Sequence, residues 1–177
     1  TRMIQALGCH RDTLNKYRGY LAATLMYQDI PPYINSMLKR LVKSPKGYLI
    51  NNGLISYLSG LKDLRLLIQT GQIGHRLENW FLNELQVWLH QYPGRQSIHY
   101  WRTSGGSEVD FVVKKSPHVF PFEVTFASHI EPKKVNNLIR FLNYEPKATI
   151  GYYIYMGEFK WDPVNRIAFI PAWSICF

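Results

Sequence analysis

The sequence predicts an α/β protein in which helices flank a mixed central sheet, preceded by a smaller helical segment. Residues 107–127 alternate apolar and polar positions as two strands around a turn, and residues 74–92 repeat apolar positions at helical spacing. A further helix and further strands follow this hairpin. The order helix, three strands, helix, strand is typical of a sheet covered by helices.

Residues 1–45 are expected to form a small helical unit and an extended connector. Gly8 suits the left-handed position that ends a first short helix, and Asp12 or Thr13 is the expected cap of a second one. Two short helices around a glycine turn are typical of a helix-turn-helix, whose second helix enters the major groove of DNA. A helical hairpin packed on a neighbouring domain is the alternative. The apolar stripe of the second helix comprises Leu14, Tyr17, Leu21 and Leu25.

The connector is the most basic stretch of a chain whose net charge is +9. Pro31 and Pro32 prevent a helix and favour an extended Ile30, and a run of cations ends at Lys46. The charge favours a polyanionic partner such as DNA, and a solvated basic face that binds nothing is the alternative. The residues expected to contact nucleic acid are Arg11, Asn15, Lys16, Lys39, Arg40, Lys43 and Arg102.

Two helices are expected between the connector and the sheet. Residues 52–70 form the first, with a buried stripe that Gly60 interrupts, and residues 74–92 form the second. Glu78 is expected in the first turn of the second helix, where the helix dipole favours an acid. The apolar stripes are Leu54, Ile55, Leu58 and Leu61 in the first helix, and Leu77, Phe81, Leu85 and Trp88 in the second.

The sheet is expected to start with residues 97–102 and to continue through the hairpin after the turn signal at 104–106. Pro132 then opens a helix that runs through Tyr144, since proline is favoured at the first helical position. Strands at 149–155 and 165–170 complete the sheet. The inner stripe of the helix comprises Val135, Leu138, Ile139 and Leu142.

The hairpin places two carboxylates opposite each other. A symmetric pairing about the 116–117 bond sets Phe111 against Phe122 and Asp110 against Glu123. Side chains alternate faces along a strand, so both acids share the face opposite the phenylalanines. Because facing like charges destabilise a sheet, we expect a cation, a basic group or a shared proton between them.

Several classes of site are excluded by the sequence. It contains no phosphate loop, no dinucleotide-binding glycine motif, no HExxH zinc motif and no GxSxG nucleophile motif. His99 and His118 lie near the hairpin and are read as structural. Cys9 and Cys176 lack metal or disulfide spacing, which favours a reducing cytoplasm. No apolar run is long enough to span a membrane, and no signal peptide is recognised.

Several segments resemble one family of proteins. LENWFLNEL, YWRTSGGSEVDFVV and FPFEVTFA, with LGCHRDTLNKYRGYL, IPPYINSMLKRLVKSPKGYL and NNGLISYLSG before them, resemble the C-terminal part, called DUF4143, of prokaryotic AAA-type ATPases. The resemblance implies an upstream ATPase domain in the same polypeptide. It also implies that residues 1–45 are part of a winged helix with its connector, and that residues 46–177 have a restriction-endonuclease-like fold.

That fold implies a site of the PD-(D/E)xK type. By resemblance, Glu78, Asp110 and Glu123 would hold Mg²⁺ or Mn²⁺, which polarises a phosphate and activates a water. Thr125 stands where the motif has its lysine. Lys133 or Lys134, from the following helix, would have to replace that lysine. Lys133 is our candidate for this role, although we expect that neither lysine reaches the carboxylates. Asn51 also stands where the family tends to have an acid, so we expect a degenerate site.

Three functions remain open. The first is a DNA-associated module of an ATPase with a degenerate nuclease-like site. The second is an active nuclease that uses Glu78, Asp110 and Glu123 with a divalent metal. The third is a protein-interaction or regulatory domain that does not touch DNA. The oligomeric state is left open by the sequence.

Overall fold

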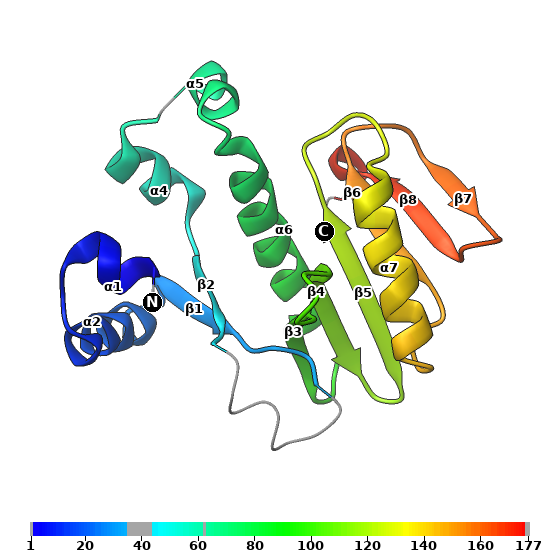
Figure 1. Ribbon diagram of the computed structural model, residues 1–177, viewed down its shortest axis with the longest axis horizontal. Helices are drawn as coiled ribbons and strands as arrows, with labels where there is room; N and C mark the ends of the chain where they lie inside the picture. Colours follow the sequence, from blue (N-terminus) through cyan, green and yellow to red (C-terminus); the bar gives the residue numbers. More distant parts are fainter. Residues whose placement is uncertain (1, 35–43, 62, 176–177) are drawn as a thin grey trace.

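The computed structural model describes residues 2–34, 44–61 and 63–175 of the chain, coloured from blue to red in Figure 1. Lys39, Arg40 and Lys43, three of the residues expected to contact nucleic acid, lie outside these ranges. Within the described ranges, no helix combines the length and the apolar character that crossing a membrane requires.

The chain begins with two helices, α1 (Arg2–Leu7) and α2 (Arg11–Ala23). Gly8 adopts a positive φ of 60° and ends α1, as predicted. The predicted caps of α2 are wrong, because the helix starts at Arg11 after His10 and no side chain caps it. The predicted stripe ends too late, since Leu25 lies beyond the helix.

A two-stranded sheet follows, which the sequence pattern did not indicate. Strand β1 (Tyr27–Ile30) pairs antiparallel with β2 (Lys46–Leu49). The extended Ile30 expected before the two prolines is the last residue of β1. The pairing joins residues on both sides of the boundary expected between residues 45 and 46.

Residues 52–70 are largely helical, as predicted, but two short helices rather than one continuous helix occupy this stretch. Helix α4 (Asn52–Ser59) ends at Gly60, whose φ of 69° is left-handed, and α5 (Leu64–Gln69) starts after Asp63. Neither helix contains a buried residue, so the predicted buried stripe is absent from both.

Helix α6 (Ile73–His90) is the longest described helix, and it agrees with the predicted span to within two residues at its C-terminal end. It buries the apolar positions that recur at helical spacing. Its buried apolar side chains are Phe81, Leu82, Leu85 and Leu89.

The central sheet has six strands in the order β3-β4-β5-β6-β8-β7. The pairs β5–β6 and β6–β8 are parallel and the other three are antiparallel, so the sheet is mixed, as predicted. Helix α7 (Pro132–Tyr144) has the predicted bounds and connects β5 to β6, and the short helix η1 (Ala172–Ser174) follows β8. The strands are β3 (Gln96–Arg102), β4 (Glu108–Lys115), β5 (His118–Val124), β6 (Gly151–Tyr155), β7 (Lys160–Asp162) and β8 (Ile167–Pro171).

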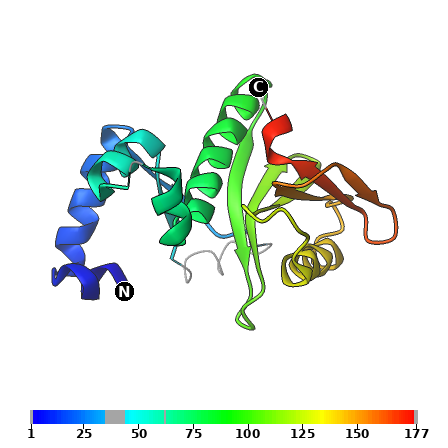
Figure 2. The ribbon, with the colours of Figure 1, turned by 90° about the horizontal axis from the view of Figure 1, so that it is seen from above.

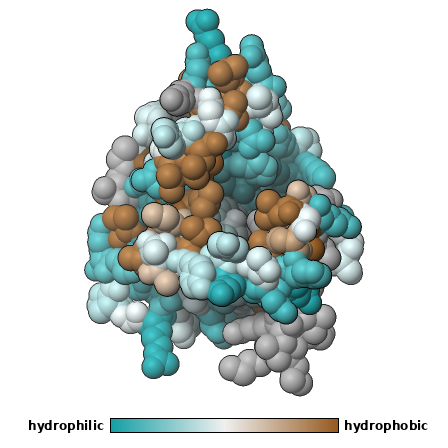
Figure 3. Space-filling view, turned by 90° about the vertical axis from the view of Figure 1, so that its left-hand side faces the viewer, coloured by the Kyte–Doolittle hydropathy of each residue, from teal (hydrophilic) through white to brown (hydrophobic). Residues whose placement is uncertain are grey.

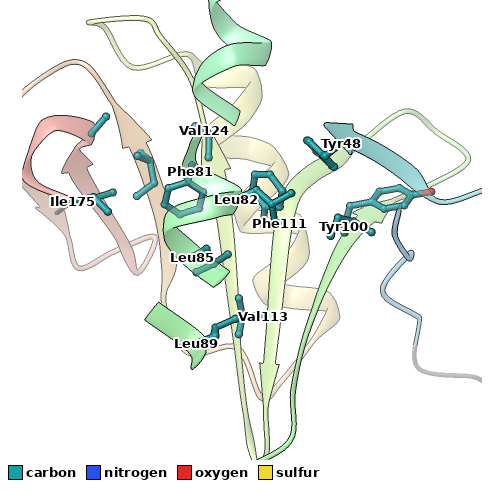
Figure 4. Close-up of a cluster of buried hydrophobic side chains, with 13 residues drawn as sticks. Tyr48, Phe81, Leu82, Leu85, Leu89, Tyr100, Phe111, Val113, Val124 and Ile175 are labelled. Carbon is teal, nitrogen blue, oxygen red and sulfur yellow. The ribbon is translucent and has the colours of Figure 1, made fainter. Parts of the chain in front are cut away.

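Helices cover the two faces of this sheet, with α6 on one face and α7 on the other (Figure 2). The alternation of β4 sends Phe111 and Val113 toward α6, where they pack on Phe81 and its neighbours (Figure 4). Val109 and Val112 belong to the second cluster, under α7. Each face of the sheet thus carries its own hydrophobic core.

The segment after β1 runs along the outer strand β3. Tyr33 donates its amide proton to the carbonyl of Tyr100 at 2.6 Å, and the amide of Tyr100 donates to the carbonyl of Pro31 at 3.1 Å. The hydroxyl of Tyr33 also donates to Glu145 at 2.6 Å. These bonds fix the N-terminal segment to the edge of the six-stranded sheet.

Candidate functional site

The hairpin of β4 and β5 has the register predicted from its centre. Phe111 pairs with Phe122, and the pairing continues to the turn. One step beyond Phe111, Asp110 and Glu123 lie on the α7 face with only 6% and 2% of their surfaces exposed. Two buried carboxyl groups therefore lie close together inside the protein.

The ammonium group of Lys134 lies between these two carboxyl groups. Its Nζ is 3.2 Å from Asp110 Oδ2 and 3.1 Å from Glu123 Oε2. It also donates to the carbonyl of Val124 at 2.9 Å. The expectation that no lysine of α7 reaches the carboxylates is therefore wrong, and the residue that reaches them is Lys134 rather than Lys133, which is exposed.

The helical spacing of α7 explains which lysine faces the carboxyl groups. Lys134 precedes the buried Leu138 by four residues and so lies on the same helix face, whereas Lys133 is rotated away from it. Asn137 follows by one turn and donates to Glu123 Oε1 at 3.3 Å. The helix period thus favours Lys134, which the sequence analysis named as an alternative to Lys133, and it adds Asn137, which was not named.

A second lysine approaches from the N-terminal segment. Lys46, at the start of β2, forms an ion pair with Glu108 and lies 3.8 Å from Asp110 Oδ1. Arg102, which was expected to contact nucleic acid, places its Nε 2.8 Å from Glu108 Oε2. Glu108 thus holds two of the cations near the site, and Asp110 lies between Lys46 and Lys134.

Glu78 supplies a third acid from α6. The prediction that it lies in the first turn is wrong, since α6 starts at Ile73 and its first turn contains no acid. Glu78 interacts electrostatically with Asp110, Lys46 and Lys134, and Tyr48 of β2 hydrogen-bonds to it. The fold thus brings the helical acid into electrostatic range of Asp110.

The three acids hold their protons differently. Burial raises the pKa of Glu78 to about 7, and the charge of Asp110 adds to this shift. Burial would also raise the pKa of Asp110, but Lys134 and Lys46 outweigh it, so this pKa lies below its ordinary value. Burial and the charge of Asp110 raise the pKa of Glu123 well above its ordinary value. The pKa values of Asp110 and Glu123 are thus shifted in opposite directions, while Lys134 contacts both side chains.

The oxygen atoms around Lys134 are of the kind that bind Mg²⁺ or Mn²⁺, because two carboxylates and a backbone carbonyl are hard donors. Within residues 2–34, 44–61 and 63–175, however, no three His, Cys, Asp or Glu side chains are grouped to hold a metal ion. The position between the donors is taken by the ammonium group. Thr125, at the motif's lysine position, is buried, and its hydroxyl accepts from the amide of Ala127 at 3.3 Å.

Among the described residues expected to bind nucleic acid, Arg102 lies near this site through Glu108, whereas those of α2 have no hydrogen bond or ion pair with its acids. Arg11, Asn15 and Lys16 are exposed on α2, and Lys16 lies over the ring of Tyr20 at 5.9 Å. Asn51, where an acid was expected, accepts from the amide of Leu54 at 2.9 Å and caps α4. Its role in the structure is that of a helix cap.

Fold and site together define an α/β protein with a mixed six-stranded sheet and a lysine-bridged pair of buried carboxyl groups. Residues 73–175 match the family described as "Domain of unknown function (DUF4143)", and the chain belongs to that family. Residues 1–65 match a second family, "Domain of unknown function (DUF8612)". No solved structure matches the chain.

Two curated relatives, both described as uncharacterized proteins, come from Mycobacterium bovis and Mycobacterium tuberculosis. Each is 24% identical to this chain over 170 residues, which is 96% of this chain. The same stretch is 37% of each relative, so the chain spans well under half the length of the curated relatives it matches.

Proposed function

We propose that the chain is a DNA-associated module of a AAA-type ATPase, with a restriction-endonuclease-like fold and a nuclease-like site that does not cut DNA. The observation that carries the proposal is the position of Lys134. Its ammonium group contacts Asp110, Glu123 and the carbonyl of Val124, the three oxygens that would otherwise face a divalent ion. In this reading the lysine replaces the metal and neutralises the acids permanently.

The charges of the site support this reading. Burial lowers the pKa of Lys134, but Asp110 and Glu123 outweigh it and raise that pKa above its ordinary value, so the lysine stays charged. The lowered pKa of Asp110 favours its ionised form and the raised pKa of Glu123 favours its protonated form, which reduces the negative charge that the ammonium has to balance. A divalent ion would have to displace a buried cation from its partners, and separating a buried ion pair is strongly unfavourable.

The DNA-associated part rests on charge. The chain has 21 Lys and Arg against 12 Asp and Glu, and basic side chains of α2 are exposed. Affinity that comes from phosphate contacts falls linearly with the logarithm of salt concentration. The ATPase context rests on the resemblance and fits relatives that are longer than this chain. A cytoplasmic location is part of the same proposal.

Calorimetric titration with Mn²⁺, paired with a duplex-DNA binding assay, tests the proposal. We expect no Mn²⁺ binding at millimolar concentration and DNA binding that weakens steeply with salt. Lys134→Met should create measurable Mn²⁺ binding, whereas Lys133→Met, the matched control one residue away, should not. Mn²⁺ binding by the unaltered chain would contradict the inert site. Absence of DNA binding would leave the protein-interaction alternative.

An active nuclease is the second candidate, and one observation favours it. Lys134 supplies, from α7, the positive charge that Thr125 lacks at the motif position, and Glu78 is within electrostatic range of Asp110. When bound, a metal would polarise the phosphate, and the displaced ammonium would stabilise developing charge. Cleavage with Mg²⁺ or Mn²⁺ that disappears in Asp110→Asn and in Lys134→Met would establish this function.

A further inference from the structure

An apolar groove of about 530 Å³ lies between the N-terminal helices and α6, within the size range of pockets that hold ligands. Helices α1 and α2 form one wall, β1 and β2 contribute the rings of Tyr27 and Tyr48, and α4 and α6 form the opposite wall. The apolar side chains from the walls are Leu7, Leu14, Tyr17, Leu21 and Ile55. Most of the stripe predicted for α2 therefore faces this groove rather than a closed core.

Exposed apolar side chains continue from the groove onto the surrounding surface. Leu7 and Tyr17 are 65% and 63% exposed, and Tyr57 and Leu58 of α4 are 72% and 68% exposed. Figure 3, which views this side of the molecule, shows apolar side chains gathered in patches around a hollow. Exposed apolar side chains gathered in this way mark an interaction site, and those of α4 lie outside the groove lining, beyond a small ligand bound inside it.

A buried arginine lies at the α6 side of the groove. Arg76 is only 9% exposed, and its Nε has no hydrogen-bond partner. Its Nη2 donates to the hydroxyl of Ser59 at 3.1 Å, and no carboxylate among the described residues forms an ion pair with it. A buried charge without a counter-charge is unfavourable, so this guanidinium lacks the partner that its burial calls for.

We propose that this groove binds an amphipathic helix of a partner protein, with a carboxylate of that helix paired to Arg76. The apolar walls would take leucine-like side chains at successive turns, which is the usual way a helix fills a groove. The guanidinium would take the carboxylate in a two-pronged hydrogen bond. The groove adjoins the lysine-bridged site, because Tyr48 and Glu78 also line it, but the lining includes neither Lys134 nor the two strand acids that Lys134 bridges.

The chemistry of the groove favours a protein helix over a nucleic acid. Leucine and tyrosine side chains dominate its walls, whereas a nucleic-acid site needs cations along a phosphate path. Arg18, the other arginine of the lining, is already paired with Asp29 at 2.5 Å. One buried guanidinium among apolar walls matches one acidic side chain among apolar ones.

The test is a displayed library of amphipathic helices of about 16 residues, a length at which helices begin to form in water. Leucine is fixed on one face and the flanking positions are fully varied. We expect the selected peptides to share one Asp or Glu beside the leucines. In fluorescence anisotropy, the best peptide should lose about tenfold in affinity when that acid becomes Asn or Gln, the size of one hydrogen bond to a charged group.

Variants of the protein identify the groove as the binding site. Arg76→Gln should abolish the preference for the acidic peptide over its amide twin, and Leu21→Gln should weaken both peptides. Arg65→Gln, which removes an arginine from α5 outside the groove lining, is the matched control and should change neither. Thermal unfolding verifies that each variant is folded. If a variant fails to fold, the unaltered chain still tests the proposal, through its affinities for the acidic peptide and for the Asn or Gln version of that peptide.

Three results would overturn the proposal. They are the selection of no helix, selected helices without a shared acid, and binding that Arg76→Gln leaves unchanged in a folded variant. Self-association that depends on Arg76 and excludes the peptides would identify a second copy of the chain as the occupant, which also contradicts a partner helix.

Discussion

Replacing Lys134 by methionine removes the charge at the site and keeps most of the side-chain length. Asp110 and Glu123, 6% and 2% exposed, would then lose the ammonium group that contacts both. Removing one partner of a buried ion pair costs about 3–5 kcal/mol because a buried charge is left without compensation. Lys46, 3.8 Å from Asp110, remains in the variant, so we expect the lower end, about 3 kcal/mol.

Urea unfolding at pH 7 and calorimetry measure this loss. For a chain of this size, about 3 kcal/mol corresponds to a fall in melting temperature of roughly 6–12 °C. Lys133→Met is the control, since Lys133 is exposed one residue earlier in the same helix; a surface substitution of that kind changes stability by about 0.5 kcal/mol or less.

The pH dependence gives a second measure with a definite sign. In the native chain Lys134 and Lys46 hold the pKa of Asp110 low, so this group contributes stability above its unfolded pKa and loses that contribution as the pH falls. Without Lys134 the pKa of Asp110 rises, and protonation then relieves the buried charge. The stability difference between the native chain and Lys134→Met should therefore shrink between pH 7 and pH 4. Equal stability of the two lysine variants, or a difference independent of pH, would refute the account of the site.

Three further predictions concern single side chains. Glu78→Gln should gain stability over the native chain as the pH rises from about 4.5 to 7, because burial raises the pKa of Glu78 to about 7 and the native state then resists its ionisation. Urea unfolding of both proteins at several pH values measures this gain. If the two stability curves ran parallel with pH, Glu78 would not be buried with the site. Asn51→Ala should cost about 1 kcal/mol through loss of the cap on α4, whereas Asn51→Asp should retain it, and melting temperatures that do not separate these variants would argue against the cap. Gly60→Ala should destabilise the chain by about 1 kcal/mol because the φ of Gly60 is 69°. Gly19→Ala, inside α2 with open space around it, should stabilise the chain by a similar amount. If calorimetry showed that both substitutions change the stability in the same direction, these backbone conformations would be contradicted.

The sequence predicts those parts of the fold whose determinants are local. The register of the central hairpin follows from its turn, and the start of α7 follows from Pro132, because proline at the first helical position needs no distant partner. The longest helix follows from its apolar period. The hairpin and this longest helix carry Glu78, Asp110 and Glu123, so the acids of the site could be found from the sequence.

The parts that were missed depend on distant partners. Strands β1 and β2 pair across the connector, and neither has enough alternation to indicate a strand alone. Lys46 enters the site only through that pairing. The choice between Lys133 and Lys134 depends on the rotation of α7 over the sheet, which requires the helix period to be combined with the buried face. Motif matching compares residue types at fixed spacings along the chain, and such spacings do not say which side of a helix faces the sheet.

The bonds between residues 31–33 and β3 have a consequence for solubility. A strand at the border of a sheet offers unpaired amide and carbonyl groups to any other extended chain, which invites intermolecular strand pairing. Here Pro31 and Tyr33 occupy the backbone groups of Tyr100, and proline has no amide proton with which to extend the ladder. At the opposite border, β7 has only three residues. A truncation that removes the chain through Tyr33 would free the border at β3, so aggregation of the truncated protein is the expected result.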